Sequence, residues 1–194
     1  MSIETWKRAQ NLQVVSLDEG AFVGRLDDFQ FDLETRRIFG WRLKGHGVFA
    51  RAGGLPAEAL VLVGRDVALI ETGDAVEWTG GRPNAAEGRA WASAYRGTAA
   101  ISRRGTALGA VQDFVIDRAG NQVTGFILHG NRLLPLDGRV NVGPAAVIVD
   151  DPDQVVELPG EGEEEREAWW ARLTSALRVG EPARPALPDA GGEE

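Results

Sequence analysis

The chain has 194 residues, of which 43% are hydrophobic and 26% are charged, and it contains no cysteine. This composition is ordinary for a globular protein, and it excludes a disulfide framework and a thiolate metal site. No apolar run reaches the roughly 18 residues of a membrane-spanning helix, and the N-terminal residues lack the apolar stretch of a signal peptide. We therefore expect a soluble, cytoplasmic protein without a transmembrane segment.

The net charge of −8 is unevenly distributed along the chain. From Asp150 to the end, 13 acidic residues stand against 4 arginines, a net charge of −9, whereas residues 1–149 hold 16 acidic and 17 basic residues, a net charge of +1. The body of the chain is thus nearly neutral, and we expect no binding to DNA.

An internal repeat organises the chain. Residues 20–45 align with residues 105–130 at an offset of 85, with 8 identities in 26 positions, where about 2 are expected from composition. Beyond this segment the offset falls to 79, and Leu55-Pro56 then matches Leu134-Pro135. A deletion of this kind is tolerated in a loop between strands. The sequence therefore predicts two copies of one module.

Each copy is predicted to consist of short strands rich in large apolar residues. In the first copy they are expected at 22–31, 38–43, 60–63 and 67–70. The turn at 32–35 corresponds to residues 117–121 in the second copy, where the pair Gly120-Asn121 is typical of β-hairpin turns. Recurring glycines suit the bulges and sharp bends of a small closing barrel. The predicted fold is mainly β, with two tandem small antiparallel β-barrels.

Two helices are predicted outside the repeated strands. Asn84 to Glu87 resembles an N-cap signature with a carboxylate at the third helical position, so a connecting helix is expected to run towards Tyr95. A C-terminal amphipathic helix is expected at 161–179, where an arc of about 120° collects its apolar side chains. These are Trp169, Trp170, Leu173 and Leu177, with Ala176. The stripe either packs on the second barrel or binds a partner.

A spaced motif occurs once in each copy and resembles the PRC-barrel family. The first copy has Gly24-x-x-x-Asp28-Phe29-x-x-Asp32, and the second has the same pattern from Gly109 to Asp117. The resemblance covers roughly residues 12–78 and 97–156. The family includes the cytoplasmic part of the photosynthetic reaction-centre H subunit and the C-terminal domain of the ribosome maturation factor RimM. The resemblance implies small barrels that bind other molecules without catalysis.

The chain is accordingly divided into five predicted parts. They are a first PRC-barrel-like repeat at 12–78, a linker with a short helix at 79–96, a second repeat at 97–158, the C-terminal helix at 161–179 and a disordered tail at 180–194, whose prolines and acidic residues favour disorder.

The residues that could carry chemistry do not form a recognisable site. Asp28 and Asp32, and their counterparts in the second copy, are too few for a hard cation, which needs about six oxygen ligands. We interpret them as hydrogen-bond acceptors for backbone N–H groups of the turns and strands. His46 and His129 lack the further ligands that zinc requires. No nucleophile elbow or phosphate-binding glycine loop is present. We therefore predict no catalytic, cofactor-binding or metal-binding residues, and no enzyme activity.

Two groups of residues are candidates for binding a partner. A basic group with interleaved aromatic residues lies in the second strand of the first copy, where it favours either a phosphate contact or a solvated strand face. The candidate partner-binding residues are Trp169, Trp170, Leu173, Leu177, Arg36, Arg42 and Lys44. The predicted function is a non-catalytic protein-binding scaffold or adaptor. The alternative is a RimM-like accessory factor in RNA metabolism or ribosome assembly, with a ribosomal particle as the partner.

Overall fold

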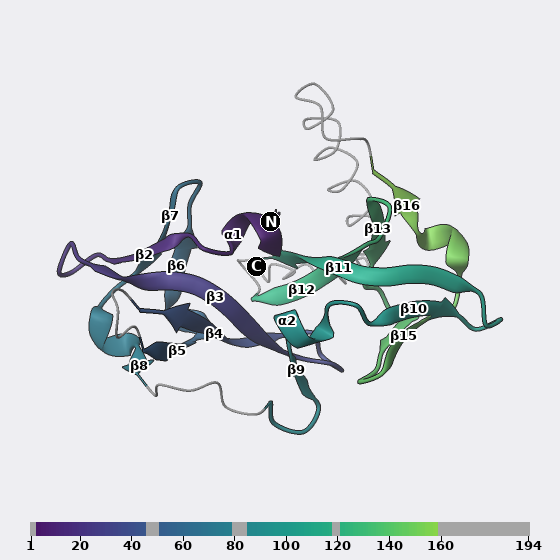
Figure 1. Ribbon diagram of the computed structural model, residues 1–194, viewed down its shortest axis with the longest axis horizontal. Helices are drawn as coiled ribbons and strands as arrows, with labels where there is room; N and C mark the ends of the chain where they lie inside the picture. Colours follow the sequence, from purple (N-terminus) through teal and green to yellow (C-terminus); the bar gives the residue numbers. More distant parts are fainter. Residues whose placement is uncertain (1–2, 46–50, 79–84, 118–120, 159–194) are drawn as a thin grey trace, which may run out of the picture.

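The computed structural model describes residues 3–45, 51–78, 85–117 and 121–158. It is mainly β, as predicted, and it consists of two curled eight-stranded sheets that lie side by side (Figure 1). In spatial order the first sheet contains β6 (Leu60–Val63), β7 (Val67–Ile70), β2 (Gln13–Ser16), β3 (Phe22–Asp32), β4 (Ile38–Lys44), β5 (Ala52–Pro56) and β8 (Glu77–Trp78), with β9 (Arg89–Trp91) paired to β3.

The second sheet has the same strand order as the first. It contains β14 (Val140–Val142), β15 (Ala146–Val149), β10 (Ala99–Ser102), β11 (Ala107–Asp117), β12 (Gln122–Leu128), β13 (Arg132–Pro135) and β16 (Val156–Glu157), with β1 (Ile3–Thr5) paired to β11. The repeat seen in the sequence thus corresponds to a repeat in topology. The predicted antiparallel pairing is found throughout both sheets except at one place in each, where β2 pairs with β7, and β10 with β15, in parallel.

Bulges at corresponding positions curl the two sheets. Between β3 and β4 the register shifts at Leu26/Asp28 and again at Gln30/Phe31. Between β11 and β12 it shifts at the equivalent places, Val111/Asp113 and Val115/Ile116. A bulge bends its strand and increases the local twist, so the same bulges give both sheets the same curvature.

The helix predicted to start at Asn84 is much shorter than expected. Among the described residues 85–96, helix is confined to α2 (Ala92–Tyr95), and Arg89–Trp91 directly before it form β9. The physical reason is Gly88, whose φ of 76° lies outside the helical region and ends any helical path. The chain then pairs with β3. The short helix α1 (Trp6–Ala9) follows β1 in the same way, and it was not predicted.

The leading strand and helix of each copy belong structurally to the other copy. β1 pairs with β11 and β9 pairs with β3. At the middle of the molecule the two turns also pair, since Ile38 N–H donates to the Asn121 carbonyl at 2.7 Å and Val123 N–H donates to the Arg36 carbonyl at 2.9 Å. These four residues are equivalent in pairs at the offset of 85. The two sheets are therefore joined about a pseudo-twofold axis.

A single hydrophobic core runs through both sheets. Phe29 of the first sheet packs edge-on against Phe114 of the second at a ring distance of 5.3 Å, and Phe31 packs against Tyr95 at 5.4 Å. Trp6 of α1 lies against Phe29 at 5.0 Å. The apolar interior is thus shared between the copies. The predicted domain limits stay a prediction.

Candidate protein-binding surface

Four apolar side chains form a row across the outer face of the first sheet. Residues directly opposite each other on neighbouring strands share a face. Leu62 lies opposite Leu69, Leu69 opposite Val15, and Val15 opposite Phe22, so the row crosses β6, β7, β2 and β3. Phe22 is 59% exposed and Leu62 is 49% exposed, while the two between them are half-buried. We call this row, together with the exposed Leu17 and Val61 beside it, the outer patch.

One strand beneath the outer patch, β7, is apolar on both faces. In β7, Ala68 and Ile70 are fully buried on the inner face, and Val67 and Leu69 lie on the outer face. A strand with one face in water normally alternates between apolar and polar residues, whereas a strand that is covered on both sides reads as a continuous apolar run. The outer face of β7 therefore has the composition of a covered surface.

A basic region borders the outer patch on the same face of the sheet. Arg25 lies opposite Gln13 and, on its other side, opposite Lys44, and both basic side chains are exposed. Arg42 is two residues from Lys44 on β4, and its guanidinium is 3.1 Å from the Asp27 carboxylate. Two like charges directly opposite each other are unfavourable unless something compensates them. We call Arg25, Lys44 and Arg42 the basic edge.

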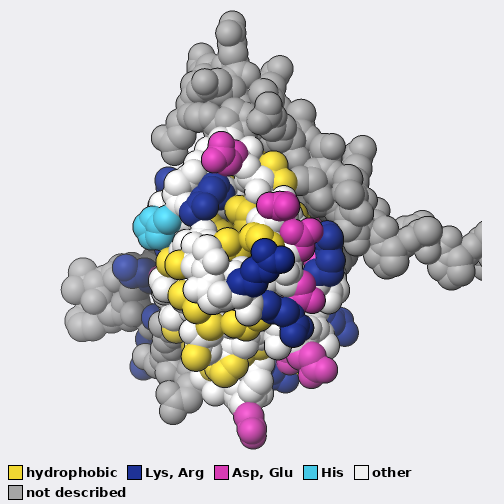
Figure 2. Space-filling view, turned by 90° about the vertical axis from the view of Figure 1, so that its right-hand side faces the viewer, with side chains coloured by type: hydrophobic (Ala, Val, Ile, Leu, Met, Phe, Trp, Pro, Cys, Tyr) yellow, Lys and Arg dark blue, Asp and Glu magenta, His cyan; other side chains and the backbone are white. Residues whose placement is uncertain are grey.

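The equivalent face of the second sheet differs from the first sheet both at the positions of the outer patch and at those of the basic edge. Counterparts of the row are Ala107, Ile101, Ile148 and Asn141, which are linked by the same cross-strand pairing. Two large exposed side chains of the first sheet are thus replaced by a small and a polar one. Figure 2 looks onto the second-sheet end of the molecule, where apolar side chains lie in a band among arginines and carboxylates. The basic edge has no counterpart there, since Ala110, His129 and Ile127 occupy its positions.

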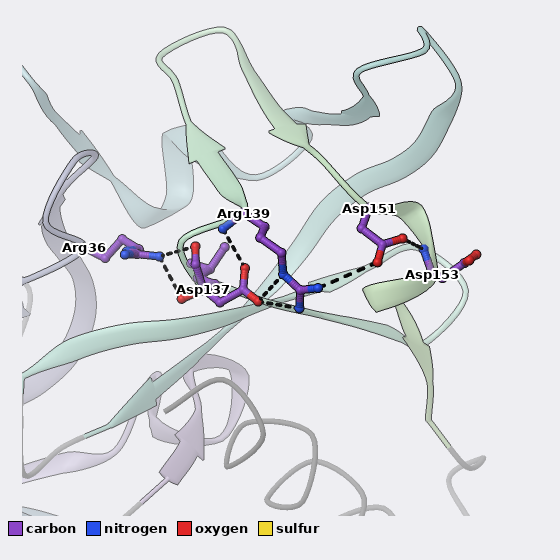
Figure 3. Close-up of polar contacts among 6 residues, drawn as sticks. Arg36, Asp137, Arg139, Asp151 and Asp153 are labelled. Atoms are coloured by element: carbon purple, nitrogen blue, oxygen red, sulfur yellow. Dashed lines mark hydrogen bonds and ion pairs between the residues drawn. The ribbon is translucent and has the colours of Figure 1, made fainter. Parts of the chain in front are cut away.

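The predicted candidate residues occupy different places. Arg42 and Lys44 belong to the basic edge, but Arg36 lies between the two sheets. Its Nη1 donates to the carbonyls of Leu136 at 2.7 Å and Asp137 at 3.1 Å, so its side chain bridges to the second copy (Figure 3). Trp169, Trp170, Leu173 and Leu177, with the whole predicted helix at 161–179, lie outside the described residues.

Arg36 is part of a charged cluster that continues through the second sheet (Figure 3). Arg139 Nη2 donates to Asp137 Oδ2 at 2.7 Å, and its Nη1 lies 3.7 Å from the Asp151 carboxylate. Burial raises the pKa of Asp137, but the hydrogen bonds from Arg139 and the charges of Arg139 and Arg36 outweigh this and hold the pKa below its ordinary value. The cluster pairs its own charges, so it stabilises the fold.

The aspartates of the repeated motif serve the backbone, as the sequence analysis interprets them. Asp32 Oδ1 accepts from the N–H groups of Glu34 and Thr35 at 3.1 and 2.7 Å, and the Thr35 hydrogen bond is the largest cause of its lowered pKa. Asp28, which is 2% exposed, accepts from Ser93 N–H at 3.1 Å and from Ser93 Oγ at 2.6 Å. It thereby holds the first turn of α2.

Asp113 makes the equivalent contact with the other helix. Both of its carboxylate oxygens accept from Lys7 N–H at 3.1 Å, in the first turn of α1. Burial raises the pKa of Asp113, in opposition to its hydrogen bonds and to the charge of Arg96. In the described ranges, no three His, Cys, Asp or Glu side chains come together as potential metal ligands. His46 lies outside these ranges.

The outer patch was missed by the sequence analysis, although a signal for it exists. Val61-Leu62 and Val67–Ile70 are apolar at consecutive positions in strands of four residues, and this departs from the alternation of a half-exposed sheet. The same pattern fits a fully buried strand, which is how short apolar runs are usually interpreted. Only the register between strands places the four side chains of the row on one outward face.

The comparisons with known proteins place the second copy in a family. Residues 92–156 match the PRC-barrel domain, from the start of α2 to the first residue of β16. The first copy, predicted at 12–78, lies outside this match. No curated protein matches the chain. None of the helices in the described part of the chain has the length and apolarity that crossing a bilayer requires.

Proposed function

We propose that this chain, whose residues 92–156 match the PRC-barrel domain, is a non-catalytic adaptor that binds another protein through the outer patch. The observation that carries the proposal is the row from Phe22 to Leu62. Contiguous exposed apolar side chains rimmed by polar ones are typical of protein interaction sites. A cytoplasmic location is part of the same proposal.

A ribosomal particle is the second candidate partner, and the basic edge favours it. Arg25 and Lys44 are exposed neighbours that could contact phosphate groups. Asp27 already pairs with Arg42, however, and this reduces the positive charge of the edge. Aliphatic side chains such as Leu62 and Leu69 contribute little to RNA recognition, which relies on aromatic stacking and on polar contacts. The outer patch therefore supports a protein partner more directly.

Affinity capture with matched variants tests the proposal. The full-length chain is immobilised and exposed to a lysate of the source organism, in parallel with Leu62→Lys and Asn141→Lys, which change equivalent positions in the two sheets. A lysine in an apolar interface should reduce capture of the partner by about tenfold or more. We expect this loss for Leu62→Lys but not for Asn141→Lys.

Salt separates the two candidate partners. Capture through the outer patch should persist when the salt concentration is raised, whereas phosphate contacts weaken steeply with salt. Recovery of ribosomal particles that is lost at high salt, and that Leu62→Lys does not affect, would establish the alternative. Equal capture of one protein partner by Leu62→Lys and the unchanged chain would remove the outer patch from the proposal.

A further inference from the structure

Carboxylates and cations lie on opposite sides of the outer patch. The pairing of β2 with β7 continues past the ends of both strands, since Asp18 N–H donates to the Glu71 carbonyl at 3.0 Å. Asp18 and Glu71 are exposed, and they lie beside the row where the hairpin between β2 and β3 turns. Arg25 and Lys44 lie beside the row in the other direction along the strands. The apolar row therefore has an acidic side and a basic side.

This distribution of charge is self-complementary about a twofold axis. When two copies meet face to face about an axis that runs along the row, each row lies on the other, and the axis interchanges the two sides of the patch. The acidic side of each copy then faces the basic side of the other, which is the arrangement that favours association. Arg25 is already positioned at this edge, because its Nη1 donates to the Asn11 carbonyl at 2.9 Å.

We propose that a second copy of this chain covers the outer patch, in a face-to-face dimer in which Arg25 of each copy pairs with Asp18 of the other. The inference rests on the proposed function, because the dimer occupies the surface to which the adaptor's partner binds. The partner must displace the second copy in order to bind. Self-association thus regulates the adaptor surface through the concentration of the chain.

The apolar contact is small enough for such displacement. The row from Leu62 to Phe22 crosses four strands, which is about 14 Å at the usual spacing between strands. Specific, stable interfaces bury about 1,200–2,000 Å² in total, and smaller ones belong to weak associations. A contact centred on one row of side chains therefore supports a monomer–dimer equilibrium in the micromolar range, and not a permanent dimer.

The other end of the molecule lacks this complementarity. The second sheet also presents apolar side chains among arginines and carboxylates (Figure 2). At the offset of 85, however, Asp18 corresponds to Arg103 and Arg25 corresponds to Ala110. Arg103 forms an ion pair with Asp150 of its own chain. The acidic and basic sides of the outer patch are therefore a property of the first sheet, and the second copy is expected there.

A charge exchange measured by sedimentation tests the inference. The full-length chain, Arg25→Asp and Asp18→Arg are each centrifuged alone over a range of concentrations, and the two variants are then mixed in equal amounts. Both positions are exposed, so neither change alters the core. We expect each variant alone to dimerise at least about tenfold more weakly than the unchanged chain, because like charges meet at both contacts. The mixture should regain the affinity of the unchanged chain, because opposite charges then meet at both contacts.

Two further variants locate the interface. Leu62→Lys places a lysine in the row and should weaken the dimer by about tenfold or more, whereas Asn141→Lys, at the equivalent position of the second sheet, should leave it unchanged. The inference is overturned if the unchanged chain stays a monomer up to about 500 μM. It is also overturned if the mixture associates no better than its components, or if Asn141→Lys weakens the dimer as much as Leu62→Lys does.

The two proposals fail in different ways. If Leu62→Lys loses the captured partner but the unchanged chain sediments as a monomer, the adaptor function stands and the dimer is wrong. If the charge exchange restores a dimer but Leu62→Lys captures the same partner as the unchanged chain, the outer patch is a dimer interface and the adaptor proposal is wrong.

Discussion

Two buried aspartates bind the copies together, each by holding the first turn of a helix contributed by the other copy. Asp28 accepts two hydrogen bonds from Ser93, and Asp113 accepts from Lys7 N–H. The repeated motif identifies these aspartates in the sequence, and their role as hydrogen-bond acceptors for backbone N–H groups could also be predicted. Their partners could not, because Ser93 and Lys7 are distant in sequence and carry no signal of their own.

The contact between Asp28 and Ser93 gives the first prediction. We expect Asp28→Ala to lower the free energy of unfolding by about 2–4 kcal/mol, because it removes the hydrogen bonds that this buried carboxylate accepts from Ser93 and leaves the buried Phe29 N–H without that acceptor. Asp27→Ala is the control, since it removes only the partly exposed ion pair with Arg42, and it should cost less than about 1 kcal/mol. Urea denaturation measures both. Equal losses for the two variants would contradict the assigned role of Asp28.

The Asp137 carboxylate gives a prediction about pH. Its folded pKa lies below the ordinary value of 3.8, so its contribution to stability is present above pH 3.8 and is lost as the pH falls through the folded pKa. Asp137→Asn should therefore be less stable than the unchanged chain at neutral pH, and the difference should shrink on acidification. Denaturation curves from pH 7 down to about pH 2.5 measure this.

An aspartate in the turn between β6 and β7 serves as the control for the pH experiment. Asp66 is exposed and lies in a turn, and Asp66→Asn should change the free energy of unfolding by less than about 0.5 kcal/mol. A difference for Asp137→Asn that stays constant across the pH range would show that its carboxylate contributes through packing and not through its charge.

At the scale of elements, the strands were predictable and their exact pairing was not. The repeated segments at 22–31 and 38–43 agree closely with β3 and β4, because long apolar runs bounded by turn residues determine them. β9 was missed because three residues carry no periodicity, and the nearby Asn84–Glu87 pattern indicated a helix. The parallel pairs were missed because pairing between β2 and β7 joins segments about 50 residues apart, and this is beyond the reach of local patterns.

Close approach of β3 to β4 gives a prediction for a glycine of the repeated motif. A Cβ atom on Gly24 would lie 2.9 Å from the Lys44 carbonyl oxygen, which belongs to the backbone and cannot move aside. We expect Gly24→Ala to destabilise the protein by about 1–3 kcal/mol through this overpacking. Gly54→Ala on β5 is the control, because its Cβ would have no neighbour within 4 Å. Thermal unfolding compares them, and similar melting temperatures would refute the explanation.

At the scale of the whole molecule, the two copies form one structure. Sequence comparison indicates two modules, and the usual reading of such a repeat is two barrels that fold separately and are joined by a linker. The topology differs from that reading, since β1 and β9 each complete the sheet of the other copy and aromatic rings from both copies make one core. This exchange of strands between the copies cannot be inferred from the repeat, because the same strand sequences could equally pair with the sheet of their own copy.

The exchange predicts that neither half of the chain folds alone. A fragment of residues 1–82 would retain β1 and α1 without β11, and it would expose Phe29 and Phe31 where they pack on Phe114 and Tyr95. Each fragment, 1–82 and 83–194, should therefore lack a cooperative unfolding transition, whereas an equimolar mixture should regain the sheets as a one-to-one complex. Circular dichroism and sedimentation measure this, and a cooperative transition in either isolated fragment would contradict the shared core.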